Sequence, residues 1–354
     1  MHTSADLIAN TLLRWFKTNQ RDLPWRRDYT PYQVWISESM LQQTQMDRVV
    51  PYYLRWMEEY PTLETLARSR EEDVLRLWEG LGYYSRAKNL RKAAEWLRSH
   101  GYDTVPGDRD VLTALPGVGP YTAGAILSIA YQEPVVAVDG NVRRVFARLG
   151  DLNLPTDRGE GDRSIRRWAT EFLHRRSPRA INQAVMEFGA SICTPKPRCN
   201  KCLLSDHCLS LQRGTVAQRP VGKTKNVRIV ADAAAVVIVH KDKIFLRRRA
   251  NQGLWAGLWE FPWTMIQDRE THAQALQREL GVLWPSIRLE KKPVASVRHS
   301  FTKWTVTLSG YQAEMDVPSL NEINQRWVTT EELRQTALPA GSRKLREQLF
   351  PMGP

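Results

Sequence analysis

The chain has 354 residues, of which 42% are hydrophobic and 25% charged, enough for two compact domains that each bury a core. Its formal charge of +13 and its pI near 9.7 favour a polyanionic partner, nucleic acid first and an anionic membrane surface second. No apolar run approaches the ~18 residues of a spanning helix, and no cleavage site follows the first apolar segment. We expect a soluble, intracellular protein.

Residues 1–212 carry apolar side chains at helical spacing and little strand-like alternation, as Ile8, Leu12, Trp15 and Phe16 illustrate. Prolines that suit helix starts recur along this stretch, at Pro31, Pro51, Pro61, Pro106 and Pro116. The sequence therefore predicts a mostly α-helical N-terminal region.

One predicted helix, PYQVWISESMLQQTQM, is interrupted by Glu38, which shares a helix face with Val34 and Leu41. Carboxylates are rarely buried without a reason, and burial favours the neutral acid that can donate a proton at neutral pH. Paired with a second, ionised carboxylate, such an acid can cleave a glycosidic bond through an oxocarbenium-like transition state. A structural carboxylate with its own partner is an equally good interpretation of Glu38 alone. Residues 42–45, QQTQ, add amides that can meet base edges.

The segment GLGYYSRAKNL, residues 80–90, combines glycines and two tyrosines with Arg86 and Lys88. This mixture suits an aromatic wedge that enters a base stack beside phosphates. Taken alone it is weak evidence, because aromatic residues near helix ends more often belong to a core.

In LPGVGPYTAGA, residues 115–125, two glycines separate a helix end from a new helix. We expect the backbone amides of Val118 and Gly119 to be open and able to hold a DNA phosphate. Downstream, in VDGNVRRVFARL, Asp139 precedes a helix whose Arg143 and Arg144 are candidates to face DNA. An ordinary helix–helix turn and a helix-capping aspartate are the alternatives.

The four cysteines of the chain lie within one short segment, with the spacing C-x5-C-x2-C-x5-C and basic residues between them. No other cysteine is left to form long-range disulfides. A zinc ribbon usually has two C-x2-C pairs, so a four-thiolate iron–sulfur cluster fits better than zinc. The predicted ligands of a [4Fe-4S] cluster are Cys193, Cys199, Cys202 and Cys208.

After residue 212 the character of the sequence changes. Residues 213–228 are basic, free of acidic residues and rich in structure breakers, which predicts a linker lying along a polyanion. ADAAAVVIVH and KIFLRRR then predict two strands joined at Lys241 and Asp242, followed by a helix in THAQALQREL, a strand in VTLSGYQAEM and a helix in SRKLREQLF. Residues 229–354 should form an α+β domain.

These segments, in this order, resemble the endonuclease III superfamily of helix-hairpin-helix DNA glycosylases, and within it the MutY-type adenine glycosylases. The resemblance covers nearly the whole chain, through LPWR, PYxVWxSExMLQQTQ, GLGYYxRAxNL, LPGVGxYTAGA, VDGNVxRV and the cysteine segment. It implies a helical catalytic domain (1–212), a basic linker (213–228) and a Nudix-like lesion-recognition domain (229–354). The expected activity is monofunctional excision of adenine opposite 8-oxoguanine or guanine in double-stranded DNA. A cytoplasmic, nucleoid-associated bacterial monomer is expected.

Within the resemblance, Glu38 corresponds to the acid that protonates adenine and Asp139 to the carboxylate that stabilises the sugar cation or forms a transient bond to it. Asn141 looks like a residue that positions the reacting groups, and Tyr121 falls where bifunctional relatives carry a lysine nucleophile, so strand cleavage is not expected. The residues expected to meet the DNA or the lesion are Arg26, Gln43, Thr44, Tyr83, Gly117, Val118, Gly119, Phe301, Thr302 and Lys303.

The sequence departs from the family pattern in two places. The first cysteine loop has five residues where six are expected, and Phe301, Thr302 and Lys303 stand where a lesion-reading Phe-Ser-His is usual. The helix after GLWAGLWEFP also has only Arg278 and Glu279 before Gly281, too few acidic groups for the magnesium site of a Nudix hydrolase. We therefore expect a recognition domain without hydrolase activity.

Two other functions compete with adenine excision. A mismatch glycosylase that removes thymine or another base also suits a tyrosine at position 121, although the second domain argues against it. A lesion-binding protein without catalysis is the other alternative, and the joint presence of Glu38, Tyr121, Asp139 and Asn141 argues against that one.

Overall fold

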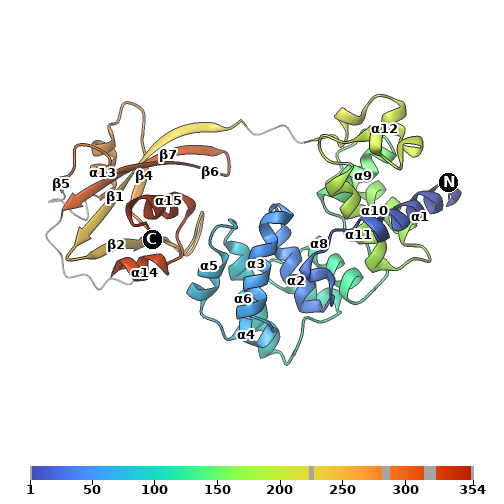
Figure 1. The fold of residues 1–354 in the computed structure, drawn as a ribbon, viewed down its shortest axis with the longest axis horizontal. Helices are drawn as coiled ribbons and strands as arrows, with labels where there is room; N and C mark the ends of the chain where they lie inside the picture. The colour runs from blue at the N-terminus through green and yellow to red at the C-terminus, as the bar shows by residue number, and fades with distance from the viewer. Residues whose placement is uncertain (1, 223–226, 281–287, 315–323, 352–354) are drawn as a thin grey trace. The chain divides into compact units, whose positions relative to one another are not determined.

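The computed structural model describes residues 2–222, 227–280, 288–314 and 324–351 (Figure 1). Backbone contacts divide the chain into two compact units: Met1–Ser69 with Asn89–Thr224, and Arg70–Lys88 with Lys225–Pro354. None of the described helices is long and apolar enough to cross a bilayer. Residues 223–226 of the predicted linker, Gly281 and Met315 lie outside the described residues.

The first unit is α-helical, as predicted for residues 1–212 (Figure 1). Its helices are α1 (His2–Asn19), α2 (Pro31–Leu41), α3 (Met46–Glu59), α4 (Leu63–Ala67), most of α6 (Ser85–Ser99), α7 (Arg109–Ala114), α8 (Pro120–Ala125), α9 (Gly140–Leu149), α10 (Gly159–Leu173), α11 (Pro178–Ser191) and α12 (Leu209–Gln212). Shorter turns of helix are η1 (Pro24–Arg26), η2 (Ile126–Ala130), η3 (Cys199–Lys201), η4 (Ser205–His207) and η5 (Val216–Gln218).

The amphipathic face of α1 forms part of a hydrophobic core with α9, α10 and α11. Ile8, Leu12 and Phe16 are buried there, and Trp15 packs against the cluster. The predicted spacing of these side chains is therefore confirmed, because residues three and four apart share one face of a helix. This core fixes α9 and α11, two of the helices that border the candidate site.

Helix starts follow the predicted punctuation with one exception. Thr30 caps α2, with its hydroxyl accepting from the Gln33 N–H, and Pro31 occupies the first position. Pro51, predicted near a helix start, instead lies inside α3. Its ring leaves the Asp47 carbonyl without the usual donor four residues on, which the helix tolerates close to its first turn.

The second unit contains a mixed β-sheet with helices on its faces (Figure 1). Its strands are β1 (Ile229–His240), β2 (Lys243–Arg248), β3 (Trp259–Glu260), β4 (Trp263–Met265), β5 (Arg288–Leu289), β6 (Ala295–Phe301), β7 (Trp304–Glu314) and β8 (Gln325–Val328). The helices are α5 (Glu71–Trp78), α13 (His272–Leu280), α14 (Thr330–Arg334) and α15 (Ala340–Leu349). The predicted turn between β1 and β2 is confirmed, since Lys241 and Asp242 both have positive φ and His240 pairs with Lys243.

Strand β1 is buried on both faces because neighbouring side chains point to opposite sides of the sheet. Ala233, Ala235 and Val237 join a core that includes Leu345 of α15. The alternate residues, Ala234, Val236 and Ile238, join a second core with Leu276 and Leu280 of α13. The sheet thus lies between α13 and α15, and strands and helices together form the mixed domain predicted for residues 229–354 (Figure 1).

Candidate active site

A cavity of about 1050 Å³ in the helical unit gathers many of the residues singled out from the sequence. Its walls come from α2, the loop after it, the start of α8, the start of α9, and α11. The predicted site residues that line it are Arg26, Glu38, Gln43, Thr44, Tyr121, Asp139 and Asn141.

Glu38 is the buried acid of this cavity. It lies on α2 with 7% of its surface exposed, and Oε2 accepts a short hydrogen bond from the Tyr121 hydroxyl on α8. Burial raises the pKa of Glu38 to about 7, assisted by the negative charge of Asp139, while the Tyr121 hydroxyl and Arg26 act in the opposite direction. A carboxyl with this pKa holds a proton in a large part of the molecules at neutral pH.

Asp139 is both a helix cap and a cavity residue, so the two interpretations of its sequence context hold together. One carboxylate oxygen accepts from the Val142 N–H at 2.7 Å and the other from Asn141 Nδ2 at 2.8 Å. Burial raises the pKa of Asp139 above its ordinary value, and these two donors counteract that rise. The donors favour the ionised carboxylate at the start of α9, where the helix dipole also favours negative charge.

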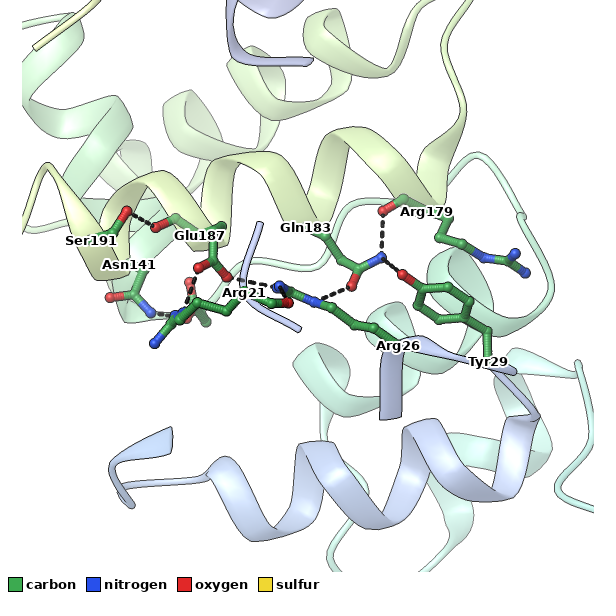
Figure 2. Close-up of polar contacts among 9 residues, drawn as sticks. Arg21, Arg26, Tyr29, Asn141, Arg179, Gln183, Glu187 and Ser191 are labelled. Atoms are coloured by element: carbon green, nitrogen blue, oxygen red, sulfur yellow. Dashed lines mark hydrogen bonds and ion pairs between the residues drawn. The ribbon is translucent and has the colours of Figure 1, made fainter. Parts of the chain in front are cut away.

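Arg26 is held at the cavity wall by α11 (Figure 2). Its Nη2 lies 2.7 Å from Glu187 Oε2, and its Nε donates to Gln183 Oε1 at 3.1 Å. Arg21 also pairs with Glu187. Although burial alone would raise it, the pKa of Glu187 lies below its ordinary value because the two guanidinium groups stabilise the carboxylate.

Glu187 and Gln183 were not predicted as site residues. Both lie on α11, four residues apart, and both are buried. The sequence contained a usable signal, since a carboxylate within the apolar run AINQAVMEF is the same anomaly that drew attention to Glu38.

Arg143 and Arg144 of α9 are half-buried and line the same cavity, so whether they face DNA stays a prediction. Arg143 pairs with Asp162 at 2.6 Å. Arg144 donates to Asn141 Oδ1 and to the Cys193 carbonyl, each at 2.7 Å. Hydrogen bonds therefore run from Asp139 through Asn141 and Arg144 to the cysteine segment.

The four cysteines line a second, small cavity, separate from the one that contains Glu38 and Asp139. None of them forms a disulfide. Arg148 of α9 borders the same cavity, with its Nη1 3.5 Å from Cys193 Sγ, and it also donates to the Arg219 carbonyl of the predicted linker. Arg219 pairs in turn with Asp151 at 2.9 Å, so the start of that linker packs on the helical unit. The basic residues between the cysteines, Lys196, Arg198 and Lys201, are exposed.

The turn between α7 and α8 differs in one respect from the expectation. The Val118 N–H donates to the Leu115 carbonyl at 3.1 Å, so it is not open, and its side chain is buried. Gly117 has φ +81, and a Cβ there would lie 2.8 Å from the Asn89 Cβ, which explains the glycine. Gly119 is exposed and caps α8, and its N–H has no backbone acceptor among the described residues.

The remaining predicted contact residues lie in the second unit. Tyr83 has positive φ and 54% exposure. Thr302 and Lys303 form the exposed turn between β6 and β7, and Phe301 pairs with Trp304 at its base. Thr302 has φ 46, which is unusual for a β-branched residue.

The helical fold and the carboxylates of Glu38 and Asp139 in one cavity are typical of a DNA glycosylase. Residues 36–169 match the model of the HhH-GPD superfamily base excision DNA repair protein, and residues 233–348 match the NUDIX domain. The adenine DNA glycosylase of Mus musculus is 33% identical over 96% of this chain and 78% of its own length, and the one of Homo sapiens is 33% identical over 96% and 73%. The chain belongs to the adenine DNA glycosylase family.

A solved structure, described as a thermostable thymine-DNA glycosylase, resembles the helical part of the chain. The match has a TM-score of 0.55 and 27% identity, and it covers 60% of this chain and 98% of that one. The helical fold is thus shared with glycosylases of other stated specificity, so fold alone does not select the base.

Proposed function

We propose that this chain hydrolyses the N-glycosidic bond of adenine paired with 8-oxoguanine or guanine in double-stranded DNA, without cleaving the strand. The observation that carries the proposal is a pair of carboxylates in one cavity with separated roles. Glu38 has a pKa of about 7 and can donate a proton, whereas Asp139 is held by two donors that favour its ionised form. Two carboxyl groups tuned apart in this way suit glycosidic cleavage.

In the proposed reaction, adenine is extruded from the duplex into the cavity. Glu38 transfers its proton to a ring nitrogen of adenine as the bond between N9 and C1′ breaks, and the bonding electrons leave with the base. Asp139 stabilises the resulting positive charge on the sugar. Water then adds its oxygen to C1′ and gives one proton to the Glu38 carboxylate, which restores the acid and leaves an abasic site and free adenine.

Tyr121 supports a monofunctional reaction. Its hydroxyl donates to Glu38, and its pKa is raised well above the ordinary value by burial and by the two nearby carboxylates. It therefore remains a neutral donor. A phenol in this place cannot form the Schiff base by which a lysine would cleave the strand.

The DNA contacts in this proposal follow the exposure of the predicted residues. Arg26, Gln43 and Thr44 line the cavity and would surround the extruded base. The exposed Gly119 amide at the end of the turn would bind a backbone phosphate, Tyr83 would wedge the stack, and Phe301–Lys303 would contact the opposite base. In domain terms, 1–212 is the catalytic domain, 213–228 the linker and 229–354 the lesion-recognition domain of a monomer.

We further propose a [4Fe-4S] cluster bound by Cys193, Cys199, Cys202 and Cys208. The donor set fits, since four unbridged thiols line one cavity. Among the described residues no three Cys, His, Asp or Glu side chains converge to hold a single ion, and a cubane does not need that convergence because each thiolate binds a different iron. Such a cluster would order the loop that carries Lys196, Arg198 and Lys201.

The cluster is tested by the metal content of protein purified without oxygen. About four iron atoms per chain and a yellow-brown colour are expected. One zinc per chain, without visible absorption, would reject the assignment. Cys202→Ser should lower both iron content and DNA affinity.

The activity is tested by single-turnover assays on duplexes that pair adenine, thymine or uracil with guanine or 8-oxoguanine. Release of adenine, fastest opposite 8-oxoguanine, is expected. Preferential release of thymine or uracil would select a mismatch glycosylase. Tight binding without release of any base would select a lesion-binding protein.

A further inference from the structure

The loop between α5 and α6, residues Glu79–Tyr84, has a conformation that few residues adopt. Gly80 and Gly82 have φ of 104 and 75, and Tyr83 has φ of 50. Left-handed backbone at a tyrosine is unfavourable and persists only when its surroundings hold it. The Tyr83 ring, 54% exposed, is thus presented by a loop that needs support.

Part of the support comes from within the loop's own helices. Trp78 Nε1 donates to the Gly82 carbonyl at 3.1 Å, and an Arg86 Nη2 donates to the same oxygen at 3.0 Å. The Arg86 guanidinium also lies over the Trp78 ring, 5.1 Å from its centre. Trp78 and Arg86, which lie on either side of the loop, are thus both hydrogen-bonded to the Gly82 carbonyl within it.

Further support comes from the C-terminal part of the same unit. Glu79 Oε1 accepts from the Leu338 N–H, and Oε2 accepts from Arg346 Nη2, each at 2.9 Å. The Tyr84 hydroxyl donates to the Leu338 carbonyl at 3.0 Å. The side chains of Glu79 and Arg346 are only 15% and 11% exposed, so this ion pair is shielded from solvent. Glu79 and Tyr84, the first and last residues of the loop, are therefore hydrogen-bonded to residues between Leu338 and Arg346.

The helix that carries Arg346, α15, also contacts the strand that leads to the hairpin Phe301–Lys303. Lys344 Nζ donates to the Arg298 carbonyl of β6 at 2.8 Å. At Gly341 a Cβ would lie 2.7 Å from His299 Nε2, so helix and strand approach as closely as glycine permits. Two residues after His299, β6 ends at Phe301. One helix thus touches both the hairpin strand and the loop that presents Tyr83.

We propose that Glu79 and Arg346 are positioning residues that couple the hairpin Phe301–Lys303 to Tyr83 through α15. Engagement of the opposite base by the hairpin would stabilise the loop conformation in which Tyr83 is presented to the DNA. The inference rests on the proposed function, because it assigns the hairpin and Tyr83 to the two sides of one mispair. It adds that reading the lesion and wedging the duplex are linked rather than independent.

The test compares the wild-type chain with Glu79→Gln in two assays on duplexes with adenine opposite 8-oxoguanine or opposite guanine. One assay is single-turnover excision. The other is the fluorescence of a 2-aminopurine beside the mispair, which reports unstacking and needs no chemistry. Glu270→Gln is the matched control, since Glu270 pairs with Arg278 of α13 in the same unit.

Coupling predicts that Glu79→Gln lowers the preference for 8-oxoguanine by about fivefold in both assays, with Glu270→Gln unchanged. Arg346→Lys keeps the charge but loses the guanidinium geometry, and it should give the same fall in preference. It replaces Glu79→Gln in the test if that variant folds poorly. Equal losses on both duplexes, or an unchanged preference, would overturn the coupling while leaving adenine excision intact. Wild-type protein that unstacks the duplex but releases no adenine would instead refute the proposed function.

Discussion

The cavity around Glu38 and the hairpin at Phe301–Lys303 differ in how far their side chains are exposed to solvent. Glu38 is 7% exposed, and its protonation is set by what surrounds it, whereas Thr302 and Lys303 are open to solvent. Phe301 anchors the hairpin base, packing 4.7 Å from the Trp255 ring. Burial can change the chemistry of a side chain by shifting its pKa, while an exposed hairpin depends on shape and donor pattern. Substitutions should therefore be far more damaging in the cavity.

The largest effect is expected for Glu38→Gln. The amide keeps the shape of the side chain but has no proton to transfer, so single-turnover excision should fall by ~10²–10⁴-fold while duplex binding persists. Glu133→Gln, at an exposed position of the same unit, is the control. Near-normal excision by Glu38→Gln would mean that another group is the acid.

The pH dependence of excision should follow Glu38. Its pKa of about 7 lies above the ordinary value of 4.5, so the proton needed for catalysis is present below pH 7 and is lost above it. The single-turnover rate should fall by about tenfold for each unit above pH 7. A rate that stays level to pH 9 would contradict this role.

Stability should show the same shift with a definite sign. The folded protein keeps Glu38 protonated up to about pH 7, whereas the unfolded chain loses this proton near pH 4.5. The contribution of Glu38 to the free energy of unfolding therefore falls as pH rises from 4.5 through 7. Glu38→Gln removes this cost, so its melting temperature relative to wild type should be higher at pH 8 than at pH 4. Equal differences at the two pH values would argue against a raised pKa.

A smaller effect is expected for Tyr121→Phe. The Tyr121 hydroxyl stabilises the ionised form of Glu38, so its removal should raise the pKa of Glu38 and move the pH–rate profile to higher pH. Tyr131→Phe, which removes a hydroxyl bonded to the Val105 carbonyl, serves as the control. A profile displaced to lower pH would reverse the assigned direction.

The smallest effect belongs to the hairpin. Lys303 Nζ lies over the Trp304 ring at 5.5 Å and is a permanent donor suited to phosphate, so Thr302→Ser/Lys303→His should raise the preference for 8-oxoguanine over guanine by a few fold. The binding of this double variant should also depend less on salt. If the preference does not change, the hairpin substitution is neutral, and the contrast between cavity and hairpin is stronger still.

Local pattern was sufficient for much of the fold and for the chemical centre. The helical spacing of apolar residues predicted the helical region, and the turn residues Lys241 and Asp242 predicted the hairpin. The presence of a carboxylate in an apolar helix indicated Glu38. The same reasoning failed at Val118, because whether an amide is open depends on how the chain turns back to Leu115. It also misplaced Pro51, since a proline can lie inside a helix near its start.

Long-range partners were beyond local pattern. No feature of residues 70–88 indicates that they pack with a segment more than 250 residues later, as the contact between Glu79 and Leu338 requires. The pairing of Arg26 with Glu187 is similarly a product of the fold. Sequence reasoning could find unusual residues but not which distant group each would meet.

The contact between Glu79 and Arg346 also has a consequence for the timing of synthesis. The two residues are 267 positions apart. At a translation rate of ~5–20 residues per second, Glu79 is synthesised roughly 13 to 53 seconds before its partner on α15. Asp139 and the four cysteines are made within that interval, so they join Glu38 in the nascent chain while the loop that presents Tyr83 still lacks this partner. The cavity can therefore form on the ribosome before the loop acquires its final support.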